Sequence, residues 1–120
     1  MDLACRNCNM ADDIRKNATA WCETVQSIVT NPAVASCIKR RCKDAWIVCG
    51  DPENHCSTHP NALGYRVPGK SSANLCIKNF SNANATGAIV IHEWAHSCNW
   101  RDGQGQGVPG GDGYLNTDHY

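Results

Sequence analysis

Residues 88–98 read Ala-Ile-Val-Ile-His-Glu-Trp-Ala-His-Ser-Cys, and this stretch decides how the second half of the chain is built. Its apolar residues recur at intervals of three and four, which predicts an amphipathic helix that begins after Asn84. The apolar stripe would anchor this helix and turn His92 and His96 to its edge. Side chains four apart on a helix lie one turn above each other, so the two imidazoles are expected side by side.

The pattern His-Glu-x-x-His at residues 92–96 is typical of a zinc site. We therefore expect His92 and His96 to bind Zn²⁺, and Glu93 to hold and deprotonate a metal-bound water. The alternative is a pair of surface or core histidines with an incidental glutamate between them. The helical context favours the metal site.

A catalytic zinc ion usually has three protein ligands and one open position for water. Glu93 is the last glutamate in the chain, so the candidates for the third ligand are Asp102, Asp112, Asp118 and His119. Asp102 is preferred, because a left-handed residue just after the helix would return the chain to the metal within a few residues. Asp112 would have to fold back across a glycine-rich segment, which costs backbone freedom.

Residues 92–102 resemble the extended metzincin motif HExxHxxGxxH/D, with Asn99 in the glycine position and Asp102 in that of the third ligand. Asparagine tolerates the left-handed conformation better than other residues with a side chain. The closest variant is the snapalysin-like group, whose third ligand is aspartate. Metzincins carry a methionine turn downstream, whereas Met1 and Met10 are the only methionines here, so the resemblance implies a minimal or divergent domain. The aspzincins, which also use aspartate, are the second choice, although their GTxxDxxYG pattern is absent.

The nine cysteines fit a disulfide-bonded protein better than a cysteine-ligated metal site. Only Cys5 and Cys8 have CxxC spacing, and a four-cysteine zinc site needs a second close pair. Up to four disulfides with one thiol left over are expected, and the spacing does not identify the pairs. Disulfides imply an oxidising compartment, so the protein is expected to be secreted or periplasmic.

Nothing in the sequence predicts a membrane span or a signal peptide. The longest apolar stretch, Ala45–Cys49, has five residues, and the segment Met1–Cys5 has neither a basic start nor an apolar core. We expect either that a signal was removed or that the chain is delivered by another route. Lys plus Arg and Asp plus Glu cancel at 11 each, so no net charge points to nucleic acid.

The rest of the chain predicts an α+β fold: a small, mainly helical single domain over residues 1–120. It would combine the HExxH active-site helix with a short β-sheet and several disulfides. Apolar periodicity predicts a helix from about Ala11 to Val29 and a second one, with Asn31 as N-cap, from Pro32 to about Cys49. Short strands are expected at residues 63–67 and 75–80, and the glycine-rich segment 103–113 is expected to be an open loop.

Together these features predict a zinc-dependent hydrolase that cleaves peptide bonds, with a peptide, protein or peptidoglycan-peptide substrate. One alternative is a zinc amidase or endopeptidase that acts on peptidoglycan as a bacterial effector, and an inhibitor or immunity protein would then be a second partner. Another is a cysteine-rich, non-catalytic binding module with a structural metal. His55 and His59 flank Cys56 in a loop and are expected to be ordinary surface histidines, with a second metal site that includes Cys56 as the alternative.

Overall fold

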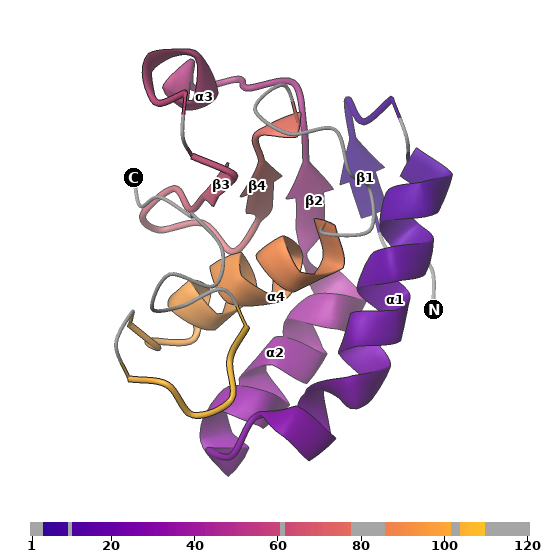
Figure 1. Cartoon of the computed structure of the whole chain (residues 1–120), viewed down its shortest axis with the longest axis vertical. Coiled ribbons are helices and arrows are strands. Elements are labelled where there is room, and N and C mark those ends of the chain that lie inside the picture. The colour runs from indigo at the N-terminus through magenta and orange to yellow at the C-terminus, as the bar shows by residue number, and fades with distance from the viewer. Residues whose placement is uncertain (1–3, 10, 61, 78–85, 102–103, 110–120) are drawn as a thin grey trace.

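A computed structural model of the chain describes residues 4–9, 11–60, 62–77, 86–101 and 104–109 (Figure 1). Within these residues four helices and a four-stranded sheet follow in the order β1 (Ala4–Arg6), α1 (Ala11–Ile28), α2 (Pro32–Asp44), β2 (Trp46–Val48), α3 (His55–Thr58), β3 (Gly64–Tyr65), β4 (Ala73–Leu75) and α4 (Thr86–Ser97). Helices α1, α2 and α4 pack against one another, and α4 also packs against β3 and β4. The short α3 lies apart from the other helices (Figure 1). The predicted α+β class with a short sheet is confirmed.

The first two helices begin where the sequence predicts them. The side chain of Asn31 accepts hydrogen bonds from the N–H groups of Ala33 (3.0 Å) and Val34 (3.3 Å), so it caps α2 as expected. The buried face of α1 consists of residues spaced by three or four, namely Ile14, Ala18, Cys22 and Val25.

The predicted end of the second helix at Cys49 is wrong. Helix α2 ends at Asp44, and Trp46–Val48 form β2, an inner strand of the sheet. The physical reason is the run of large and β-branched residues at 46–48, which fits a buried strand with partners on both sides. Gly50, with φ of +82°, therefore turns the chain after a strand and does not end a helix.

The sheet has the strand order β1-β2-β4-β3, in which β1, β2 and β4 are parallel and β3 runs antiparallel to β4. The strand expected at residues 63–67 corresponds to β3. The one expected at 75–80 lies earlier, at 73–75, and residues 78–80 lie outside the described part. The sequence did not predict β1, whose three residues pair with β2.

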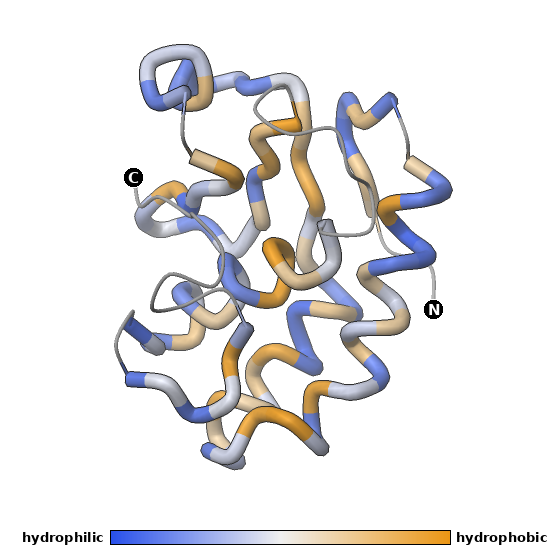
Figure 2. Tube along the Cα trace, in the orientation of Figure 1, coloured by the Kyte–Doolittle hydropathy of each residue, from blue (hydrophilic) through white to orange (hydrophobic). Residues whose placement is uncertain are grey.

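Helix α4 is the centre of the molecule. Its residues 86–95 are all buried, so the expected one-sided apolar stripe is wrong: this helix is enclosed on every side. Its first turn is held to α1, because the Gly87 N–H donates to Oδ1 of Asn17 at 2.7 Å. Hydrophobic residues colour the first turns of this helix and the neighbouring strands, as well as the junction between α1 and α2 (Figure 2). The histidine motif therefore sits on an element that packing holds in place.

Four disulfides link the elements, and all nine cysteines lie in described residues. The pairs are Cys8–Cys49, Cys22–Cys42, Cys37–Cys98 and Cys56–Cys76, and Cys5 keeps its thiol. The expected number of bridges and the expected single thiol are confirmed. Such a set of bridges indicates an oxidising, extracellular type of environment. Among the described helices, none is both long and apolar enough to cross a membrane.

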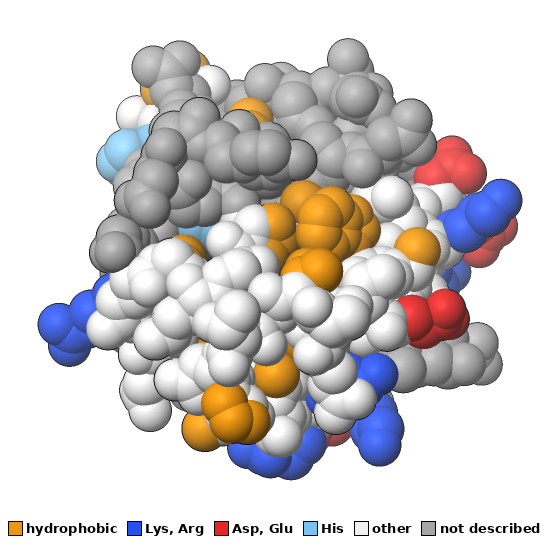
Figure 3. Space-filling view, turned by 60° about the horizontal axis from the view of Figure 1, so that its bottom comes forward, with side chains coloured by type: hydrophobic (Ala, Val, Ile, Leu, Met, Phe, Trp, Pro, Cys, Tyr) orange, Lys and Arg blue, Asp and Glu red, His pale blue; other side chains and the backbone are white. Residues whose placement is uncertain are grey.

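The view in Figure 3 shows how charge is distributed over one face. Basic and acidic side chains lie at the rim of this face, with both signs side by side on its right, and form no single patch of one sign (Figure 3). This agrees with the balance of 11 basic and 11 acidic residues in the chain.

Candidate metal centre

Helix α4 brings His92 and His96 together in the way their spacing predicts. Their Nε2 atoms lie 3.0 Å apart, and their ring centroids are 4.7 Å apart. His92 is fully buried and His96 is half-buried. The two imidazoles therefore converge on one point at the flank of the helix.

The other ring nitrogens are fixed by the backbone. Nδ1 of His92 lies 2.9 Å from the carbonyl oxygen of Pro109, and Nδ1 of His96 lies 3.0 Å from that of Trp100. A carbonyl oxygen can only accept a hydrogen bond, so each Nδ1 must carry a proton. In a neutral imidazole the lone pair is then on Nε2. Two lone pairs facing each other repel unless a cation, either a proton or a metal ion, lies between them.

This arrangement fits a zinc ion. Zinc–nitrogen bonds of about 2.0–2.1 Å in a tetrahedral site place two nitrogen ligands about 3.3 Å apart. The observed 3.0 Å between the two Nε2 atoms is close to that value. Histidine ligands also characteristically donate their second N–H to a carbonyl or carboxylate, as both do here.

The third ligand falls outside the described residues. Asp102, Asp112, Asp118 and His119 all belong to segments whose placement is not described. Within the described residues no group of three or more His, Cys, Asp or Glu side chains is placed to hold a metal ion. The structure thus brings together two of the three predicted ligands.

Glu93 lies on the side of α4 that faces β3, and its side chain is fully buried. A β-carbon added at Gly64 of β3 would lie 3.2 Å from Oε2 of Glu93 and 2.6 Å from Cγ2 of Ile89. The missing side chain at Gly64 therefore leaves the room that the carboxylate occupies between helix and strand.

The end of α4 has the left-handed residue that was expected at position 99. Asn99 has φ of +67°. The N–H of Trp100 donates to the carbonyl of Ala95 (3.1 Å) and the N–H of Asn99 to that of His96 (3.2 Å), which is the Schellman arrangement. The predicted left-handed residue at position 99 is confirmed. It directs the chain back over the histidines through Trp100.

Trp100 is a site residue that the sequence analysis did not identify. Its ring is 2% exposed and lies 5.1 Å from the His92 ring and 5.2 Å from the His96 ring, measured between centroids. Its Nε1 donates to the carbonyl of Gly105 at 3.1 Å. The only signal in the sequence was its place four residues after His96, where an aromatic side chain can cover the preceding turn.

The described part of the glycine-rich segment, residues 104–109, is not the open loop that we predicted. The carbonyl of Gln106 accepts a hydrogen bond from the Thr30 N–H at 2.8 Å, and Val108 is buried in the core. Gly107, with φ of +78°, lies so close to the Ile28 carbonyl that no side chain could fit. The contacts of this segment with α1 and the core place the Pro109 carbonyl next to His92. No local sequence signal predicts this contact.

The alternative of a second metal site around Cys56 is excluded, because Cys56 is bonded to Cys76. His55 is not the surface histidine that was expected, since it is buried. His55 and His59 stack with centroids 4.1 Å apart, and His55 also lies 4.7 Å from the Tyr65 ring. The Tyr65 hydroxyl donates to Glu53 at 2.6 Å, and burial, followed by this hydrogen bond, raises the pKa of Tyr65. His55, His59, Tyr65 and Glu53 therefore form a packed polar cluster that links α3 to β3.

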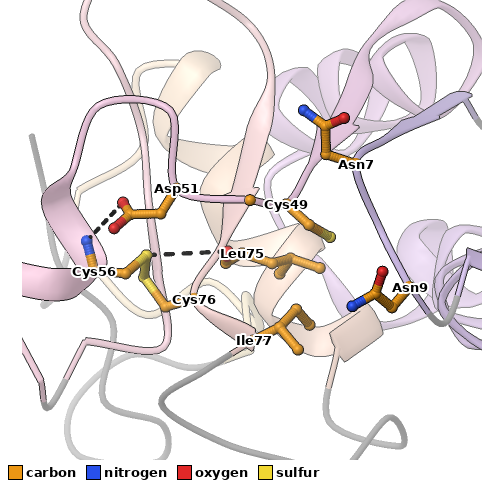
Figure 4. Close-up of a pocket in the computed structure, with 9 residues that line it drawn as sticks. Asn7, Asn9, Cys49, Asp51, Cys56, Leu75, Cys76 and Ile77 are labelled. Carbon is orange, nitrogen blue, oxygen red and sulfur yellow. Dashed lines mark hydrogen bonds between the residues drawn. A yellow bond between two sulfur atoms is a disulfide. The ribbon is translucent and has the colours of Figure 1, made fainter.

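A cavity of about 350 Å³ opens at the carboxyl ends of β1, β2 and β4 (Figure 4). Asn7 and Asn9 lie on one side of it and Leu75 and Ile77 on another (Figure 4). The carboxylate of Asp51 at its rim accepts hydrogen bonds from α3, including the Cys56 N–H at 2.8 Å. None of the described residues that line the cavity belongs to α4, so it is separate from the metal centre.

Comparison with protein-family models, with curated proteins and with solved structures finds no match to this chain.

Proposed function

We propose that the chain is a zinc-dependent hydrolase that cleaves peptide bonds. The observation that carries the proposal is the convergence of two Nε2 atoms whose rings are oriented by the carbonyls of Trp100 and Pro109. Two facing lone pairs repel each other, so packing alone does not favour this arrangement, whereas a bound cation would. The proposed ligands are His92, His96 and Asp102, in the metzincin-like arrangement of the snapalysin-like type.

The protein side chains divide the work of hydrolysis. A bound zinc ion lowers the pKa of its water towards about 7 and polarises the scissile carbonyl. Glu93 accepts the proton of the attacking water and passes it to the leaving nitrogen. Its position against Gly64 fixes the carboxylate on one side of the helix. Trp100 covers the two imidazoles and limits the access of bulk water to their inner edge.

A closed structural zinc site is the alternative, and the complete burial of His92 and Glu93 is the observation that favours it. A structural site has four protein ligands, whereas a catalytic one keeps a position for water. X-ray absorption of the zinc-loaded protein, with the visible spectrum of the cobalt form, distinguishes these two ligand sets. Three protein ligands and one water are expected.

The first prediction concerns the metal. Purified protein is expected to bind about one zinc ion per chain, and His92→Ala and His96→Ala are expected to abolish this binding. Equilibrium dialysis with metal analysis measures the stoichiometry. His59→Ala is the matched control, because His59 stacks on His55 away from α4. Full zinc occupancy in a His92→Ala/His96→Ala double variant would exclude this metal centre.

The second prediction concerns Glu93. The Glu93→Gln variant should keep its zinc and lose activity by roughly 10²–10⁴-fold, because an amide preserves the shape of the side chain and cannot accept a proton. Release of fluorescent peptides from a labelled protein substrate measures turnover, and peptidoglycan stem peptides test the cell-wall alternative. Glu23→Gln, on the exposed side of α1, is the control. Near-normal turnover in Glu93→Gln would remove Glu93 as the base.

A further inference from the structure

Helix α2 holds the last turn of α4 at two neighbouring points. Cys37 is bonded to Cys98, and Nε of Arg41 donates to Oγ of Ser97 at 3.1 Å. Cys37 and Arg41 are four residues apart and therefore lie on one face of α2. Their partners are consecutive residues at the end of α4. The covalent link and the hydrogen bond thus act on the same short segment.

That segment is the one that the candidate metal centre depends on. His96 lies in the last turn of α4, and terminal turns open more easily than helix interiors. The carbonyl that orients His96 belongs to Trp100, so Cys98 stands midway between the ligand and the residue that orients it. A displacement of Cys98 would disturb both.

The Cys37–Cys98 bond is also the disulfide most open to solvent on both sides. Cys37 and Cys98 are both half-buried. Each of the other three bridges contains at least one cysteine that is at most 2% exposed, namely Cys49, Cys22, Cys42, Cys56 or Cys76. Thiol–disulfide exchange requires a thiolate to reach a sulfur atom, and in this bond both cysteines are partly exposed, so a reductant can approach it from either side.

We propose that the Cys37–Cys98 disulfide is a redox switch for the metal centre: His92 and His96 hold zinc tightly only when this bond is formed. The inference rests on the proposed zinc site and adds its regulation. A protein of this kind gains its metal in an oxidising compartment and loses it in a reducing one. The cell that makes the chain would thereby avoid premature hydrolysis.

The reduction is a two-electron exchange with a dithiol of the thioredoxin class. One thiolate of the reductant attacks the sulfur of Cys37 or Cys98, and the protein disulfide breaks. The second thiol of the reductant then closes its own disulfide and displaces the other protein sulfur. Both protein sulfurs finish as thiols, and the reductant is oxidised.

The direct test compares two double variants that each remove one bridge. Cys37→Ala/Cys98→Ala is expected to raise the Kd for zinc by about 10–100-fold, the range typical of lost support around a metal ligand. Cys56→Ala/Cys76→Ala removes a bridge beside α3 and should leave zinc affinity unchanged. Competition with a chromogenic chelator gives the affinities, and circular dichroism confirms folding. Equal zinc affinity in Cys37→Ala/Cys98→Ala and wild type would overturn the switch while leaving the metal centre intact.

A second measurement uses the wild-type protein and covers the case in which the variant does not fold. Mild reduction with a phosphine, followed by alkylation and removal of the reductant, should label Cys37 and Cys98 before the cysteines of the other three bridges, as mapped by mass spectrometry. Cys5 is free before reduction, so its labelling in untreated protein is the reference. The share of chains that bind zinc with wild-type affinity should fall in proportion to the labelled fraction. Labelling of another pair first, or undiminished affinity after labelling at Cys37 and Cys98, would overturn the proposal. Absence of zinc binding in untreated wild type would instead remove the proposed function together with its switch.

Discussion

Asn99 determines the direction in which the chain leaves α4. Its φ of +67° is sterically unfavourable for most residues with a β-carbon, and asparagine accepts it more readily than they do. The turn that results places the Trp100 carbonyl 3.0 Å from Nδ1 of His96. The backbone conformation of Asn99, which is not itself a ligand, therefore sets the tautomer of the candidate ligand His96.

The third prediction tests this residue. Asn99→Val should destabilise the fold by about 1–2 kcal/mol, because a β-branched residue resists the left-handed conformation. It should also weaken zinc binding by about 10-fold or more, since the Trp100 carbonyl would no longer orient His96. Thermal unfolding and chelator competition measure the two effects. Asn99→Gly is the control, because glycine adopts the same φ freely, and it should bind zinc like the wild type.

At the scale of elements, the segment 104–109 supports His92 as the turn at Asn99 supports His96. It is anchored by the Gln106 carbonyl on the Thr30 N–H and by the buried side chain of Val108. Pro109, its last described residue, accepts a hydrogen bond from Nδ1 of His92 through its carbonyl oxygen. The two ligands are thus oriented by two different backbone segments that both follow α4.

The fourth prediction compares two glycines of this segment. Gly105 and Gly107 both have positive φ, but a β-carbon at Gly105 meets no atom within 4 Å, whereas at Gly107 it would collide with the Ile28 backbone. Gly105→Ala should therefore cost only the conformational strain, roughly 1 kcal/mol. Gly107→Ala should cost more and should raise the zinc Kd by about 10–100-fold, because the segment must shift away from α1. Equal zinc affinities for both variants would show that the docked segment does not position His92.

Much of the secondary structure could be predicted from local patterns, and the errors have a common physical cause. Helix starts are local, and the Asn31 cap and the left-handed Asn99 were both predictable from residue type. The boundary between α2 and β2 was not, because strand Trp46–Val48 is defined by partners in β1 and β4 that are distant in sequence. An apolar run of this length fits a helix or a strand equally well until its neighbours are known.

In the candidate site, too, the features that depend on local sequence could be predicted and those that depend on tertiary contacts could not. The convergence of His92 and His96 follows from helix geometry alone and was predicted. The carbonyls of Trp100 and Pro109, and the space beside Glu93 that Gly64 provides, depend on tertiary contacts. No spacing rule indicates such contacts, because backbone carbonyls belong to every residue and carry no sequence signature.

At the scale of the whole molecule, the disulfides reinforce elements that already pack or pair with one another. The sheet consists of strands of two or three residues, which give little stability without additional links. Cys8–Cys49 joins the ends of β1 and β2, while Cys22–Cys42 joins α1 to α2. Each bridge in a small domain typically contributes about 2–4 kcal/mol. The fold and the geometry of the candidate centre therefore depend on an oxidised chain.

The fifth prediction concerns the cysteine that takes no part in these bridges. Cys5 lies in β1 beside Ile47 of β2 and is half-buried, and burial raises the pKa of its thiol, with the nearby charge of Arg15 opposing this in part. A raised pKa means a smaller thiolate fraction at neutral pH, and the thiolate is the nucleophile.

In denaturant without reductant, thiol titration should find one thiol per chain. In the native protein near pH 8 this thiol should react with iodoacetamide more slowly than an exposed cysteine, and the rate should rise as the pH passes above the ordinary thiol pKa. Cys5→Ser should abolish the signal and leave zinc affinity unchanged, because Cys5 lies in β1 and pairs with β2, whereas the two histidines are on α4. Nine reactive thiols in denaturant would exclude the oxidised fold. An average of two would show that one of the four bridges is only partly formed, and three that one bridge is absent.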